Sequence, residues 1–240
     1  MDIGRSLETA RAYLAAQMVE AKTRAQREAE PAALFVTISR QSGAGGLVVA
    51  ERLAQILNQR GFACPRTPWV VFDKNLLQRV IEENRLPESY MDQMEEKVLP
   101  RFQTVVNEML SVHPAVSRLV AHTSRTILHL ATMGSSVLVG RGANLLAAGL
   151  PGGLHVRLVG SPGRRLQFLI DHYGLTREEA SRRMTDEDEG RSFYVKKHFN
   201  RDVDDPLLYH LVLSTDLLGH DGAASLIAAA LETKSGSPAG

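Results

Sequence analysis

Residues 34–50, LFVTISRQSGAGGLVVA, decide the fold. They begin with a continuous run of apolar and β-branched residues, as expected for a strand that is buried on both faces of a parallel sheet. A turn with three glycines follows, and residues 46–60 are predicted as a helix. The stretch therefore predicts a strand, a glycine-rich turn and the start of a helix.

Four further short apolar runs predict strands, and the segments between them predict helices. Short buried strands that alternate with helices indicate an α/β fold with a mainly parallel five-stranded sheet. The predicted strands cover residues 33–39, 69–73, 135–142, 153–161 and 209–214. The other predicted helices cover residues 75–84, 90–134, 164–173, 176–199 (as two helices) and 221–232. Thr176 and Glu179 have the spacing of a capping box at the start of the 176–199 segment.

The main domain is predicted over residues 31–232, with an inserted helical lobe at about 75–134. Residues 1–30 form a helical extension with a thin apolar stripe, which predicts a packing arm or a homodimer contact. Residues 233–240 are predicted as a disordered tail. The stripe consists of Leu7, Ala10, Leu14 and Met18.

Composition and charge exclude several classes of protein. With 28 basic and 27 acidic side chains, the chain lacks the basic excess of a nucleic-acid or membrane-surface protein. Cys64 is the only cysteine, so neither a disulfide framework nor a cysteine metal site is expected. The histidines have no metal-ligand spacing, and no secretory signal or membrane span is found. We expect a soluble cytoplasmic protein.

The glycine-rich turn is a candidate phosphate site, although many such turns connect a strand and a helix without binding a ligand. The backbone of Ser42, Gly43, Ala44, Gly45, Gly46 and Leu47 can form an anion nest at the N-terminus of the following helix. The usual motif is G-x-x-x-x-G-K-[ST]. Here Arg40 stands at the first glycine, Gly46 at the lysine and Leu47 at the hydroxyl. Arg40 can replace the missing charge, or it can be a surface arginine paired with an acid.

Asp73 ends the second predicted strand, on the edge of the sheet where the glycine-rich turn also lies. A carboxylate there can hold magnesium through water or orient a substrate. The same residue type is also preferred as the N-cap of the helix that follows. Both roles remain open at this point.

Five motifs occur in the order seen in the cytidylate kinase-like family, and the chain resembles that family over about residues 33–232. The motifs are TISRQSGAGG, VLVGRGAN, RLVGSPGRRLQFLI, DEDEGR and DPLLYHLVLST. The resemblance implies a P-loop kinase of the α/β/α type. It also implies ATP and Mg²⁺ as cofactors, a small-molecule nucleotide as substrate and transfer of a phosphoryl group to an acceptor such as CMP.

The resemblance also implies roles for arginines that follow the predicted strands. Arg141 would grip the acceptor phosphate; its alternative is a salt bridge at the sheet edge. Asn144, one turn further on, is a substrate-binding candidate on its residue type alone: its amide can hydrogen-bond a base or cap the helix. Arg165 and Arg191 would neutralise the transferring group.

A lid is implied over about residues 176–204. Arg182, Arg183 and Asp188 belong to it, with Asp188 three residues before Arg191 as in the D-x-x-R motif of the family. The alternative is a charged helix whose side chains pair at i,i+3 and i,i+4 on a solvated face.

Three functions remain open on the sequence. The first is a nucleoside monophosphate kinase. The second is a catalytically silent module that binds a nucleotide or anion for regulation, which the loss of both lysine and hydroxyl favours. The third is a kinase for another small metabolite.

Overall fold

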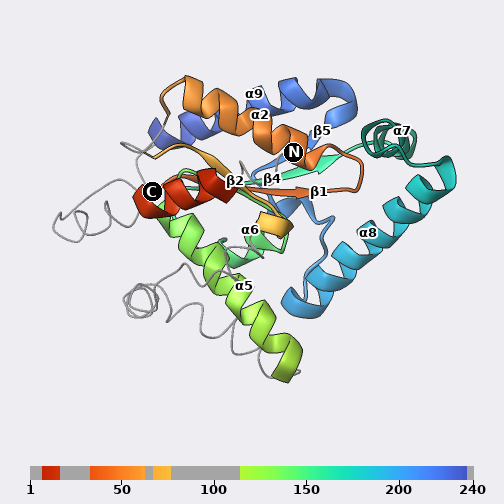
Figure 1. Cartoon of the computed structure of the whole chain (residues 1–240), viewed down its shortest axis with the longest axis horizontal. Helices are drawn as coiled ribbons and strands as arrows, with labels where there is room; N and C mark the ends of the chain where they lie inside the picture. Colours follow the sequence, from red (N-terminus) through yellow and green to blue (C-terminus); the bar gives the residue numbers. More distant parts are fainter. Residues whose placement is uncertain (1–6, 17–32, 63–66, 77–113, 237–240) are drawn as a thin grey trace.

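The computed structural model describes residues 7–16, 33–62, 67–76 and 114–236. A five-stranded parallel sheet forms its centre, with the strand order β2-β3-β1-β4-β5 (Figure 1). The strands are β1 (Phe35–Arg40), β2 (Val70–Phe72), β3 (Ser136–Val139), β4 (Gly153–Val159) and β5 (Leu211–Ser214). All five lie within their predicted segments or extend them by one residue, and the predicted α/β fold class is confirmed.

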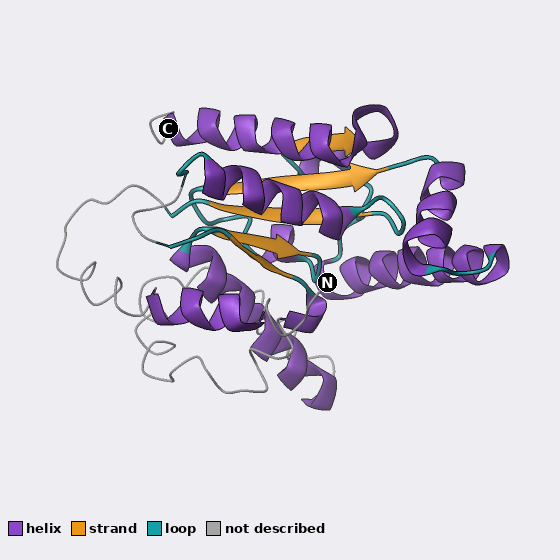
Figure 2. Cartoon of the chain, turned by 45° about the horizontal axis from the view of Figure 1, so that its top comes forward, coloured by secondary structure: helices purple, strands orange, loops and turns teal. Residues whose placement is uncertain are grey.

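Helices cover both faces of the sheet and make three layers (Figure 2). On one face, α2 (Gly46–Gln59) packs beside α9 (Thr215–Gly236). On the other face lie α5 (Pro114–Met133), the short α6 (Ala143–Leu146) and a helix over residues 7–16.

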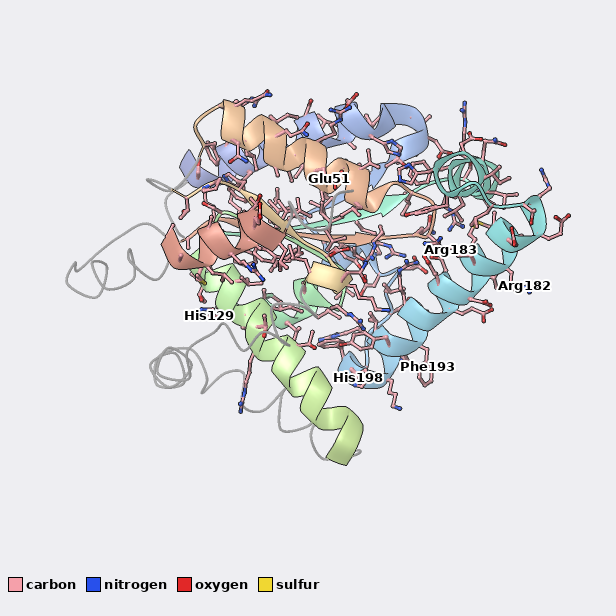
Figure 3. All side chains as sticks on the ribbon, viewed as in Figure 1. Glu51, His129, Arg182, Arg183, Phe193 and His198 are labelled. Carbon is pink, nitrogen blue, oxygen red and sulfur yellow. The ribbon has the colours of Figure 1, made fainter. Side chains whose placement is uncertain are left out.

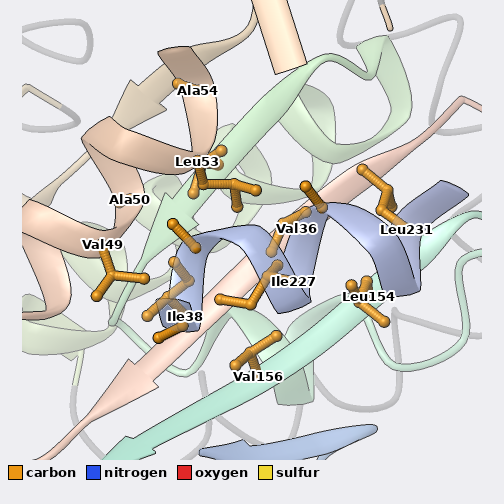
Figure 4. Close-up of a cluster of buried hydrophobic side chains, with 14 of the residues drawn as sticks. Val36, Ile38, Val49, Ala50, Leu53, Ala54, Leu154, Val156, Ile227 and Leu231 are labelled. Carbon is orange, nitrogen blue, oxygen red and sulfur yellow. The ribbon is translucent and has the colours of Figure 1, made fainter. Parts of the chain in front are cut away.

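Side chains of β1 alternate between the two cores. Phe35 packs with α5 and α6, whereas Val36 and Ile38 pack with α2 and α9 (Figure 4). Both faces of this strand are buried, which explains its uninterrupted apolar run. Because both faces are buried, β1 cannot shift by one residue against its neighbours. Its last residue, Arg40, therefore lies at the carboxyl ends of the strands, beside the glycine-rich turn.

The helix over residues 7–16 packs against its own domain. Ala10, Tyr13 and Leu14 are buried in the core beneath α5. The Tyr13 hydroxyl donates to the carbonyl oxygen of Gly134, and its ring lies 5.6 Å from that of Phe72. The packing role therefore accounts for this face of the helix, while the homodimer contact stays a prediction.

Two helices lie beyond the carboxyl ends of the strands, α7 (Pro162–Tyr173) and α8 (Arg177–Phe199). The predicted capping box is confirmed: the Thr176 hydroxyl accepts from the Glu179 N–H, and the Glu179 carboxylate accepts from the Thr176 N–H. The prediction of two helices over 176–199 is wrong, because α8 continues through Gly190. Ion pairs at i,i+3 and i,i+4 along its length stabilise this mostly polar helix.

The C-terminal helix also differs from the prediction. α9 begins at Thr215, has a non-helical Gly219 (φ 66°, ψ 173°) and ends at Gly236. The first residues of the predicted tail are therefore helical. Most of the predicted helical lobe, and Cys64, lie outside the described residues. Among the helices that are described, none has the length and apolar character needed to span a membrane.

Candidate active site

The turn between β1 and α2 presents unused N–H groups. Gly43 and Gly45 have φ values of 78° and 70°, in the left-handed region that favours glycine. Within the described part of the chain, the N–H groups of Gly43, Gly45, Gly46 and Leu47 have no hydrogen-bond acceptor. α2 begins here without a side-chain cap and without an acidic residue in its first turn. The turn therefore has the geometry of an anion nest at a helix N-terminus.

A cavity of about 330 Å³ lies at the carboxyl ends of β1 and β3. Four cationic side chains from separate segments line it: Arg40, Lys74, Arg141 and Arg191. Glu187 is the one acidic side chain in the described lining. The excess of positive charge in a concave site favours a ligand with more than one negative charge.

Arg40 extends along the cavity and is largely shielded from solvent. Its guanidinium has no hydrogen-bond acceptor among the described residues. Arg40 is therefore not the surface arginine paired with an acid that the sequence left as the alternative. Burial, together with the neighbouring Arg191 and Arg141, lowers the pKa of Arg40 to about 10, while Glu187 and Asp73 oppose the shift. The guanidinium therefore remains charged at neutral pH.

Arg141 and Asn144 meet at the same cavity. Gly140, Arg141 and Gly142 adopt φ values of 86°, 57° and 66°, so a non-glycine residue is held in the left-handed region here. Arg141 has no acidic partner among the described residues. The salt bridge that was the alternative role of Arg141 is therefore not formed with any of them. Asn144 does not cap α6, because Gly142 is the N-cap and no side chain caps it. Instead, the buried Asn144 Nδ2 has no partner within the described structure.

Asp73 follows β2 and caps the next helical turn. Its Oδ1 accepts a hydrogen bond of 2.8 Å from the Leu76 N–H, which confirms the N-cap interpretation. Its role toward magnesium or an acceptor stays a prediction. Its negative charge also favours the charged form of Arg40 and so raises the pKa of that arginine.

The predicted lid helix α8 contacts the glycine-rich turn through two neighbouring acids. Asp188 Oδ1 accepts from the Ser42 N–H at 2.7 Å, and Glu187 Oε2 accepts from the Ser42 hydroxyl at 2.8 Å. Ser42 was expected to bind phosphate, but here both of its donors face lid carboxylates. Glu187 was not singled out in the sequence, although it neighbours Asp188 and stands four residues from two arginines.

Two of the predicted arginines, Arg165 and Arg191, contact these acids. Arg165 Nη1 lies 2.5 Å from Asp188 Oδ2 and also donates to the Ser42 carbonyl oxygen at 3.1 Å. Arg191 contacts Asp188 at 3.0 Å and Glu187 at 2.7 Å. The Nε of the buried Arg165 side chain is left without a partner in the described structure. This network thus holds α8 against the glycine-rich turn, and it contains the charges that we expect to act on a transferring phosphoryl group.

Arg182 and Arg183 occupy different sides of α8 (Figure 3). Arg183 faces the sheet, and its Nε donates to Glu187 at 2.9 Å. Arg182 is exposed on the outer side, in a shallow surface with Arg177 and Asp186. The structure therefore brings Arg183 to the site and leaves Arg182 away from it.

A buried arginine on β4 supports the edge of the cavity and was missed in the sequence. Arg157 donates to the Ser39 hydroxyl at 2.9 Å and lies 2.5 Å from Asp204. The Tyr209 and Ser39 hydroxyl oxygens also lie within hydrogen-bond distance, 3.3 Å apart. The available signal was a charge inside the apolar strand GLHVRLVGS, since a buried charge needs partners.

The lid network predicts a loss of stability in acid. Burial alone raises the pKa of Glu187, but hydrogen bonds from Ser42, Arg191 and Arg183 outweigh it and bring the pKa from 4.5 to about 2. The folded state therefore gains stability above pH 4.5 and loses it as the pH falls toward 2. Allowing for partial exposure, we expect a loss of about 1–2 kcal/mol from this group.

Denaturant titrations between pH 6 and roughly pH 2.5 measure this effect, with Glu187→Gln as the test variant. Glu187→Gln should show the shallower acid dependence. Glu232→Gln, which removes an exposed partner of Arg60, serves as the control and should follow the wild type. An equal dependence of the free energy of unfolding on pH in Glu187→Gln and the wild type would show that Glu187 does not cause the acid effect.

The comparisons with known proteins bear on the family and the fold. The profile of the cytidylate kinase-like family matches residues 35–217, and the chain belongs to that family. It is accordingly a kinase-like nucleotide-binding protein. No curated protein matches the chain.

Two solved structures align with the chain, and the first of them supports the fold. An uncharacterized protein from Eubacterium ventriosum aligns with a TM-score of 0.66 and 20% identity, over 83% of this chain and 98% of that one. Shikimate kinase from Bacteroides thetaiotaomicron aligns with a TM-score of 0.44 and 17% identity, over 84% and 98%. At such identities the likeness concerns the fold alone.

Proposed function

We propose that the protein transfers the γ-phosphoryl group of ATP to a nucleoside monophosphate such as CMP. The observation that carries the proposal is the four-cation cavity directly beside a nest of unused N–H groups. The nest would bind the donor phosphates, and the cavity would bind the phosphate of the acceptor. An acceptor phosphate oxygen would attack the γ-phosphorus while the β–γ bridging bond breaks, giving ADP and a nucleoside diphosphate.

The chain's arginines supply the positioning and the charge. Arg141 and Asn144 would bind the acceptor from the end of β3 and from α6. Arg165 and Arg191 would stabilise the transferring group once the lid acids give way, since charge placed on that group dominates catalysis of this reaction. Glu187 and Asp188 currently hold these two arginines in place.

Magnesium fits this site only through indirect ligation. Leu47 offers no hydroxyl, and the Ser42 hydroxyl is bonded to Glu187. Asp73 has one oxygen, Oδ2, without a hydrogen bond among the described residues and would hold the ion through water. When bound, Mg²⁺ would neutralise charge on the donor phosphates.

A silent anion-binding module is the second candidate. It is favoured by the two lid carboxylates that occupy Ser42 and by the absence of the loop hydroxyl. Such a protein would bind ATP without transferring its phosphoryl group to any acceptor.

Thermal shift and phosphoryl-transfer assays separate the two functions. We expect Mg-ATP and CMP each to raise the melting temperature by several degrees, and their mixture to form ADP. A panel of other nucleoside monophosphates and small hydroxyl metabolites tests the acceptor class. Stabilisation by ATP without turnover of any acceptor would establish the silent module, and no stabilisation by either nucleotide would overturn both functions.

A further inference from the structure

The phosphate loop differs from the usual motif at two positions that are related in space. G-x-x-x-x-G-K has a glycine first and a lysine last. This chain has Arg40 first and Gly46 last. A cation and a glycine have thus exchanged places across the loop.

The side chain of Arg40 fills the space that a side chain at position 46 would need. A Cβ built on Gly46 would lie 2.7 Å from the Cγ of Arg40 and 3.2 Å from its Cβ and Cδ. Contacts under 3.0 Å do not occur for real Cβ atoms, so a lysine at 46 is incompatible with Arg40 as it lies. The aliphatic stem of Arg40 therefore runs directly over the position from which the usual lysine would start.

The guanidinium continues from this stem toward the end of β3. A Cβ on Gly140 would lie 2.0 Å from Nη1 of Arg40. Any side chain at position 140 would therefore overlap the guanidinium, and glycine leaves that space free. The head group then borders the cavity that Arg141 and Arg191 also line. Gly46 and Gly140 together give one arginine a route from the phosphate loop to the proposed acceptor cavity.

The charge of Arg40 is not balanced within the described structure. Burial, Arg191 and Arg141 disfavour its charged form, and the two opposing acids act on it without a hydrogen bond. Glu187 is bonded to Ser42 and to two other arginines, and Asp73 caps a helical turn. A guanidinium has five N–H donors, so a mostly buried one with no acceptor indicates a site for an anion.

We propose that Arg40 performs the task of the missing lysine, and that Gly46 is the glycine that makes room for it. The guanidinium binds the outer donor phosphates from the first position of the loop, and it lies between donor and acceptor. This inference rests on the proposed function for its catalytic part, but its phosphate-binding part stands separately.

Binding of tripolyphosphate, measured by calorimetry, tests the inference without requiring turnover. We expect Arg40→Gly to weaken the affinity by roughly 10- to 100-fold, as for the loss of a charge-assisted contact. The exchange variant Arg40→Gly/Gly46→Lys restores the glycine and the lysine of the usual motif and should recover most of that affinity. Gly46→Lys alone should lose affinity and lower the melting temperature, because both side chains then compete for one space.

A control and a kinetic arm complete the design. Arg60→Met removes an exposed arginine at the far end of α2 and should leave the affinity unchanged. If the wild type transfers phosphate, kcat should follow the same order: wild type, exchange variant, Arg40→Gly. Tripolyphosphate affinity within threefold of wild type in Arg40→Gly, or no recovery in the exchange variant, overturns the role of Arg40 and leaves the proposed function standing. No tripolyphosphate binding by the wild type overturns both.

Discussion

Gly43→Ala should destabilise the protein by about 2–5 kcal/mol and remove phosphate binding at the loop. A Cβ on Gly43 would lie 2.3 Å from the carbonyl oxygen of Arg165 and under 3.0 Å from its carbonyl carbon and Cα. All three atoms belong to the backbone of α7, so no side-chain rotation relieves the contact. The φ of 78° adds strain for any residue with a Cβ.

The consequence extends to the lid because Arg165 is part of the contact. Its guanidinium bonds to the Ser42 carbonyl oxygen and to Asp188 of α8, so separating α7 from the loop breaks the first bond and disturbs the second. Denaturant unfolding measures the stability loss, and tripolyphosphate calorimetry measures the loss at the site.

Gly61→Ala is the matched control. Gly61 also has a positive φ, 64°, but a Cβ there would meet nothing within 4 Å. This variant isolates the backbone strain and should cost about 1–2 kcal/mol with unchanged binding. A Gly43→Ala protein no less stable than Gly61→Ala would contradict the packing argument.

Arg141→Asn should lower kcat/KM for the acceptor by about 100-fold while leaving stability nearly unchanged. Arg141 borders the cavity and has no acidic partner among the described residues, so its removal leaves no known charge unpaired. Asparagine is chosen because it tolerates the left-handed φ of 57° better than alanine does. The loss therefore reflects the guanidinium and not the backbone.

Steady-state kinetics with each substrate varied in turn separate acceptor binding from donor binding. The KM for the donor should change much less than the KM for the acceptor. Arg182→Gln, on the outer side of α8, is the control and should behave as the wild type. A change of less than threefold in kcat/KM for the acceptor in Arg141→Asn would contradict the proposed role of Arg141 in acceptor binding.

The fold could be predicted from sequence because its signals are local. Four of the five strands are short, mostly buried runs, whereas β5, at the end of the strand order, is a short apolar run that is only partly buried. The helix count over 176–199 failed for a physical reason: a polar segment with Gly190 suggests a break, yet the pairing of Arg183 and Arg191 with Glu187 supports one continuous helix.

The site could be predicted only in part. Arg40, Arg141 and the glycine-rich turn follow strands of one parallel sheet, so their meeting at one edge follows from topology. The contacts of Ser42 with Glu187 and Asp188 join residues about 145 positions apart, and no local pattern encodes them. The support of Ser39 by Arg157 has the same origin.

The contacts at Ser42 also bear on selectivity among anions. Any ligand that takes the Ser42 N–H must first displace a carboxylate that belongs to the protein itself. Asp188 is therefore a tethered competitor, present at a local concentration that a free ligand matches only with several simultaneous contacts. An anion with a single phosphate makes too few contacts to displace Asp188 easily. A polyphosphate chain also binds the free N–H groups of the turn, and these added contacts favour its displacement of Asp188.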